Sequence, residues 1–90
     1  MGKKKTVEVG GISVEVAETA FDNMEMVELL AKAQDGNILV LPKVCAILFG
    51  ADRYESLKGE LADEDGVCTA TAMTEFVVDV MRKAGEEGKN

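Results

Sequence analysis

Apolar and polar residues alternate near the start of the chain. Residues 6–9 and 12–16 place apolar side chains at every second position, as a half-buried β-strand does. Gly10 and Gly11 separate the two runs, and glycine readily adopts the positive φ of a two-residue hairpin turn. The pattern predicts a β-hairpin over residues 6–16, whose apolar face must be covered by a helix or by a second copy of the protein.

Helical spacing replaces this alternation in the next two segments. Thr19 can cap a helix that runs to about residue 33, where the apolar arc is wider than the roughly 100° needed for packing on one side. That helix therefore has two faces to cover. Pro42 suits the first turn of a second helix, residues 42–49, which is apolar nearly all round and ends before Gly50. Such a helix is expected at the centre of the fold or in an interface.

Two further helices are predicted in the C-terminal half of the chain. Residues 52–61 form a short helix, and the segment from Asp52 to Glu55 resembles a capping box. The last helix starts near Thr71 and is amphipathic, with apolar residues at i, i+3, i+4 and i+7 spacing as far as Ala84. Together these elements predict an α+β fold: an N-terminal β-hairpin followed by a mainly α-helical bundle of about four helices.

A length of 90 residues limits this fold to a single domain. The expected organisation is a basic, disordered arm over residues 1–5, the hairpin over 6–16, a helical body over 17–85 and a frayed polar tail over 86–90. So short a chain does not easily bury all the apolar helical surface that its sequence encodes. Some of that surface is expected to contact another chain, so self-association is also predicted.

Charge is distributed unevenly along the chain. Fifteen of the 17 acidic residues, but only four of the ten cationic ones, lie between residues 6 and 81, so this body carries a net charge of −11. Nucleic-acid binding is not expected, because affinity for nucleic acids comes largely from cations that displace phosphate counterions. The longest apolar stretch, residues 38–49, is shorter than the roughly 20 residues of a membrane span, so no membrane partner is expected either.

The residue inventory argues against catalysis and metal binding. The chain has no histidine, which is the usual general base near neutral pH and the commonest metal ligand. Cys45 and Cys68 stand 23 positions apart, without the paired spacing of a zinc site. Their surroundings favour two buried, unreactive thiols in a reducing cytoplasm over a disulfide. No catalytic residue, metal site or cofactor is predicted, and the protein is not expected to be an enzyme.

Protein binding is the function class that remains. The candidate partner-binding residues lie on the second face of the first helix and on the apolar second helix; they are Met26, Leu29, Leu30, Val44, Ile47, Leu48 and Phe49. The alternative is that these residues form the core. The substitution Leu29→Asp distinguishes the two: it abolishes binding with the helices intact if Leu29 is exposed, and unfolds the protein if Leu29 is core.

The order of segments resembles that of a known family. The hairpin TVEVGGISVEV, the helix MVELLAKAQDGN, the stretch ILFGADRYESLKGELADEDGV, a closing amphipathic helix and the ending GEEGKN are together similar to the small tail assembly chaperones of long-tailed bacteriophages and prophages. The strongest parts are the Leu-Phe-Gly ending at residues 48–50, followed by Tyr54 and Leu57, and the acidic turn at 63–66. The resemblance covers residues 6–90.

The resemblance implies a non-enzymatic holdase in the cytoplasm of the bacterial host that is not part of the mature virion. Such chaperones keep the long tape measure protein soluble while subunits of the tail tube protein polymerise around it. Many members also have a longer product, made by ribosomal frameshifting, whose added domain recruits tail tube protein. The ending Gly88-Lys89-Asn90 is compatible with a slippery run of codons.

A second interpretation is left open by the charge distribution. The acidic body can present Glu8, Glu15 and the acidic residues 63–65 to a basic partner, as a small regulatory or inhibitory protein-binding module does. Salt distinguishes the two functions, because a client held by apolar burial stays bound at 1 M salt. A purely electrostatic partner dissociates well below that concentration.

Overall fold

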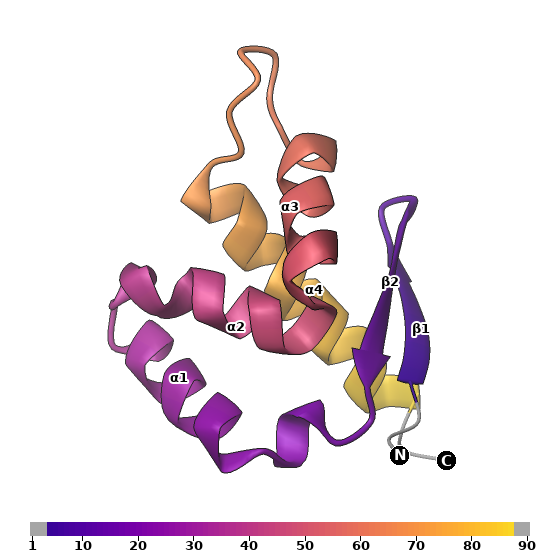
Figure 1. Ribbon diagram of the computed structural model, residues 1–90, viewed down its shortest axis with the longest axis vertical. Coiled ribbons are helices and arrows are strands. Elements are labelled where there is room, and N and C mark those ends of the chain that lie inside the picture. The colour runs from indigo at the N-terminus through magenta and orange to yellow at the C-terminus, as the bar shows by residue number, and fades with distance from the viewer. Residues whose placement is uncertain (1–3, 88–90) are drawn as a thin grey trace.

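The computed structural model describes residues 4–87 and shows a β-hairpin packed against a set of α-helices (Figure 1). The elements, in chain order, are β1 (Lys4–Val9), β2 (Ile12–Ala17), a 3-10 turn (Ala20–Asp22), α1 (Met24–Gln34), a second 3-10 turn (Ile38–Val40), α2 (Leu41–Phe49), α3 (Ala51–Glu60) and α4 (Ala70–Glu87). This order confirms the predicted α+β class, with an N-terminal hairpin followed by four α-helices in the described part of the chain.

The hairpin is antiparallel and closes with a two-residue turn. Val9 pairs with Ile12 at its end, and Gly10 and Gly11 both have positive φ, at 57° and 84°, as the predicted turn requires. Val7 and Val14 face each other in the register and are both buried. β1 contacts α4 and β2 contacts α2, so helices of the same chain cover the apolar face of the hairpin.

Both ends of the chain are more regular than the sequence pattern indicates. β1 begins at Lys4, because Lys4 and Lys5 continue the ladder opposite Ala17 and Val16, so the predicted disordered arm does not extend over residues 4–5. At the other end, α4 continues to Glu87, past the expected boundary at residue 85. Residues 1–3 of the predicted arm and 88–90 of the predicted tail lie outside the described residues.

Three of the predicted helix starts are shifted or wrong. Thr19 makes no side-chain capping bond; a 3-10 turn follows it, and Asn23 caps α1 by accepting a hydrogen bond from the Glu25 amide at 2.8 Å. The capping box at residues 52–55 is absent, because Gly50, with φ of 89°, joins α2 directly to α3. The last helix begins one residue early, at Ala70, where the Thr69 hydroxyl accepts from the Ala72 amide.

The core is built around α2, the helix that is apolar nearly all round. This helix contacts α1, α3 and β2, which confirms the central position predicted as one of its two options. Val44, Cys45 and Leu48 are buried on it, and the ring of Phe49 packs against that of Phe76 with centroids 6.0 Å apart. Among residues 4–87, no helix combines enough length and hydropathy to cross a bilayer.

Candidate partner-binding groove

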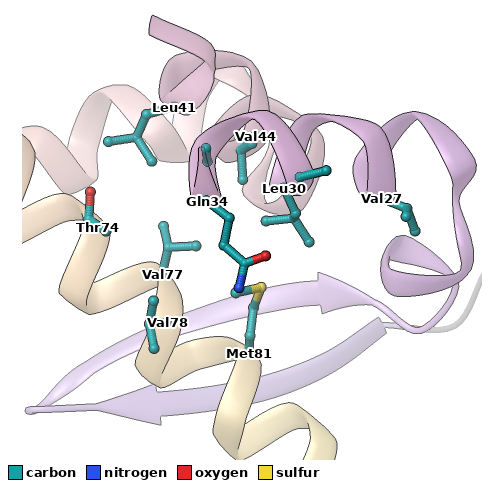
Figure 2. Close-up of a pocket in the computed structure, with 11 residues that line it drawn as sticks. Val27, Leu30, Gln34, Leu41, Val44, Thr74, Val77, Val78 and Met81 are labelled. Atoms are coloured by element: carbon teal, nitrogen blue, oxygen red, sulfur yellow. The ribbon is translucent and has the colours of Figure 1, made fainter. Parts of the chain in front are cut away.

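A long apolar groove separates α1 from α4, with α2 at its base (Figure 2). We call it the α1–α4 groove; its volume is about 740 Å³ and it is open to solvent along its length. It is lined by eleven residues, namely Val27, Leu30, Ala31, Ala33, Gln34, Leu41, Val44, Thr74, Val77, Val78 and Met81. None of these residues carries an ionisable side chain, so the groove can bind by apolar burial but offers no acid, base or charged nucleophile.

One wall of the groove is an apolar face of α1 that shares only Leu30 with the predicted second face. Val27, Leu30 and Gln34 follow helical spacing and lie along this wall, as Figure 2 shows. The neighbouring face of the same helix, with Met26 and Leu29, is buried in the core. The wide apolar arc predicted for this helix is therefore divided: one half packs inside the domain, and the other half faces the groove.

The opposite wall is formed by α4. Thr74, Val77, Val78 and Met81 are spaced as i, i+3, i+4 and i+7, which places them on one helix face toward α1 (Figure 2). Val77 is buried at the base of the wall, whereas Val78 is 39% exposed. Val27 on the facing wall is 44% exposed, so each wall leaves one valine of the lining partly open to solvent.

Thr74 carries an unsatisfied polar atom within this wall. Its Oγ1 is buried and has no hydrogen-bond partner among the described residues. A buried hydroxyl without a partner typically costs about 1 to 3 kcal/mol of stability, so most native proteins avoid one. Its location in the α1–α4 groove means that this part of the surface is not optimised for the stability of the isolated chain.

Most of the predicted partner-binding residues lie in the core. Five of the seven are buried, namely Met26, Leu29, Val44, Leu48 and Phe49, and the interpretation as core residues applies to them. Ile47 is half-buried against the same core. Leu30 is also half-buried and lines the groove, and buried Val44 contributes to its base. The structure thus brings Leu30 and Val44 together in the candidate site and places the other five outside it.

The α4 wall is the part of the site that the sequence analysis missed. The apolar stripe of the last helix contains both Val77 and Met81, but neither is among the predicted partner-binding residues. A signal was nevertheless present, because Val78 widens the apolar arc of this helix in the same way that Val27 widens that of α1. The groove forms because α1 and α4 both carry an apolar arc that is wider than the core can cover.

The opposite side of the molecule has polar contacts at the hairpin edges. The Arg53 guanidinium donates a hydrogen bond to the Ser13 carbonyl at 2.7 Å and forms an ion pair with Glu60. This hydrogen bond from Arg53 lowers the pKa of the Glu60 carboxyl below its usual value and raises the pKa of Arg53. On the other strand, the Lys83 ammonium donates to the Glu8 carbonyl at 2.7 Å.

A smaller hollow of about 380 Å³ lies beside Arg53, between the hairpin and α3. Lys4 and Arg53 bring two cations to it, but Glu15 is also part of the lining and Arg53 is already bonded to Ser13 and Glu60. Arg53 is therefore not free to bind an anion, and the carboxylate of Glu15 also disfavours one.

The two thiols are free but differ in exposure. Cys45 is completely buried, and this burial, together with the nearby Cys68, raises the pKa of its thiol to about 11. At neutral pH the Cys45 thiol is therefore protonated and a poor nucleophile. Cys68 is half-buried, so the prediction of two buried cysteines holds for Cys45 only.

The described residues contain no group of three or more Cys, Asp or Glu side chains placed to hold a metal ion. The chemistry of the α1–α4 groove suits an apolar surface of another protein. Comparisons of the chain with protein-family models, with curated proteins and with solved structures gave no significant match.

Proposed function

We propose that the protein is a tail assembly chaperone: a non-enzymatic holdase that binds the tape measure protein of a long-tailed phage in the host cytoplasm. In this proposal the chaperone keeps the tape measure protein soluble until tail tube protein assembles around it, and then leaves. A longer, frameshifted product would recruit the tube protein. The observation that carries the proposal is the open apolar groove on a strongly acidic domain.

The groove has the properties that a holdase for an extended helical client needs. Its lining is uncharged, and its two walls leave Val27 and Val78 partly exposed, so a client that covers them removes apolar surface from water. Each Å² of apolar surface buried contributes about 25 cal/mol, and several copies bound along one client add avidity. The net charge of −7 keeps such a complex soluble.

Co-expression with the tape measure protein encoded in the same genome tests this proposal. The wild-type chain is expected to keep the tape measure protein in the soluble fraction and to co-purify with it. Val78→Asp is expected to weaken this binding by about tenfold or more, because it leaves a carboxylate against the apolar client. The variant itself should remain folded, since Val78 is 39% exposed.

Val67→Asp is the matched control, because Val67 is also a half-exposed valine, at 52%, but does not line the groove. It should bind like the wild type. Binding that survives 1 M salt supports apolar capture, whereas loss of binding at moderate salt would instead favour the acidic regulatory module. A tape measure protein that stays insoluble with the wild-type chain contradicts the proposed function.

A further inference from the structure

The borders of the α1–α4 groove are more acidic than basic. On the outer side of the α1 wall, Glu28 lies three residues before Ala31, a lining residue, and Asp35, the C-cap of α1, lies four residues after it; Lys32, next to Ala31, is the exposed cation of this helix. On α4, Glu75 and Arg82 have the same relation to Val78. The acidic side chains are exposed, and thus available to a partner that lies in the groove.

The cation on the α4 border is partly compensated. Arg82 donates a hydrogen bond to Asp79 at 3.4 Å, an ion pair within α4 itself. The three carboxylates of Glu28, Asp35 and Glu75 therefore outnumber the cations at the edges of the groove, which are Lys32 and the paired Arg82. An occupant with cations at the corresponding positions gains charge complementarity, and one with carboxylates there is repelled.

A second copy of this chain does not fit that description. Two copies that share their grooves would bring Glu28, Asp35 and Glu75 of one copy close to the same residues of the other, in a chain whose net charge is −7. Like charges across an interface cost free energy and select against a partner. The predicted self-association would therefore use a different surface.

The walls also indicate the backbone form of the occupant. Both walls are faces of α-helices, whose backbone groups are bonded within the helix, so the groove has no free strand edge to which an extended peptide can add. The lining on each wall spans eight residues, from Val27 to Gln34 and from Thr74 to Met81, or about two helical turns. A third helix laid between the two walls can place side chains at i, i+4 and i+7 against them.

We infer that the groove takes one amphipathic α-helix of the client, with a narrow apolar stripe that Lys or Arg residues border on both sides. This inference rests on the proposed function and specifies the chemistry of the client segment. Apolar burial supplies most of the affinity, while the acidic borders select basic over acidic helices and set the orientation of the bound helix.

Two labelled peptides of about 18 residues test the inference. Both carry the same leucine stripe at i, i+4 and i+7 spacing; one has lysines and the other glutamates at the border positions. Fluorescence anisotropy at about 50 mM salt measures affinity, and circular dichroism measures helix formation on binding. The wild-type chain is expected to bind the lysine-bordered peptide at least about tenfold more tightly and to increase its helicity.

Charge reversal on the protein provides the matched comparison. The double variant Glu28→Lys with Glu75→Lys should lose or reverse the preference for the lysine-bordered peptide. Glu64→Lys with Asp65→Lys changes the net charge equally in the exposed turn before α4 and should keep the preference. If both double variants respond alike, the preference comes from the net charge alone, and the inference is overturned.

The remaining outcomes separate the inference from the proposed function. Equal binding of the two peptides, binding without gained helicity, or no binding of either overturns the inference, while the tape measure solubility assay still judges the function independently. Val78→Asp should weaken the binding of the lysine-bordered peptide to the protein. Unchanged affinity would place the peptide outside the groove. A dimer that Val78→Asp converts to a monomer would show that a second copy is the occupant, and would equally overturn the inference.

Discussion

The hairpin side and the groove side of this domain both face water, but they differ in whether side chains of the same chain cover their exposed groups. On the hairpin side, Arg53 and Lys83 donate hydrogen bonds to Ser13 and Glu8, which face each other in the register on opposite edges of the hairpin. On the groove side, Val27 and Val78 remain partly exposed, at 44% and 39%. Only the hairpin side is closed by the chain itself.

The difference arises because an exposed strand edge promotes aggregation more than an exposed helix face does. A two-stranded sheet has two free edges, and an uncovered edge can pair with strands of other molecules. Cations bonded to edge carbonyls interfere with such pairing. The Lys5 ammonium similarly donates a hydrogen bond to the Ala84 carbonyl near the C-terminal end of α4. Uncovered helix faces have no unpaired backbone groups, so they can stay open for a partner with less risk of aggregation.

The largest expected change in stability tests the boundary between the core face and the groove face of α1. Leu29→Asp should destabilise the domain by about 4 kcal/mol or more, because losing a buried leucine costs about 2 to 5 kcal/mol and a buried carboxylate adds a desolvation cost. Val27→Asp, two positions away, should leave the fold intact. Leu29 is 7% exposed and Val27 is 44% exposed. Urea denaturation followed by circular dichroism measures both, and equal destabilisation of the two variants would show that the groove wall is part of the core.

A smaller effect of opposite sign is expected within the groove. Thr74→Val removes the buried hydroxyl without changing the side-chain volume much, so it should raise the stability of the isolated chain by about 1 kcal/mol. Thermal denaturation measures this change, with the exposed Thr71→Val as the control on the same helix. A destabilised Thr74→Val variant would mean that the hydroxyl has a hydrogen-bond partner in solution.

The smallest expected effect concerns the hairpin side and depends on pH. Because the pKa of Glu60 is lowered on folding, its contribution is complete above the ordinary value of 4.5 and is lost as the pH falls through the lower folded value. Arg53→Ala should therefore reduce stability slightly at neutral pH and flatten the loss of stability as the pH falls below the ordinary Glu60 value of 4.5. Urea midpoints across this range check the prediction, and unchanged pH dependence would contradict it. Lys58→Ala, which removes the Glu55 ion pair within α3, is the control.

Local patterns were sufficient to predict the elements, because each depends on neighbours in sequence. Alternation around Gly10 and Gly11 predicted the hairpin and its turn, and the nearly uniform apolar character of residues 42–49 predicted a central or interfacial α2. Helix starts were less accurate where two capping candidates compete. Thr19 and Asn23 both suit an N-cap, and the choice depends on the path of the chain between β2 and α1.

The candidate site was only partly predictable. The sequence identified α1 as a helix with two apolar faces, and Leu30 is on the face that lines the groove. It also suggested α2 as a binding surface, but α2 is covered by α1, α3 and β2. Apolar residues destined for the core and for an interface have the same composition, so periodicity cannot separate them.

The sequence by itself determined the α+β class, the order of the hairpin and four helices, the acidic body and the excess of apolar helical surface, because these follow from composition and from spacing along one element. Only the tertiary structure decided where that excess lies. Whether Leu29 or Val27 faces water depends on the orientation in which α1 packs against α2 and on the separation between α4 and α1. Those positions result from packing between segments distant in sequence, which no local pattern encodes.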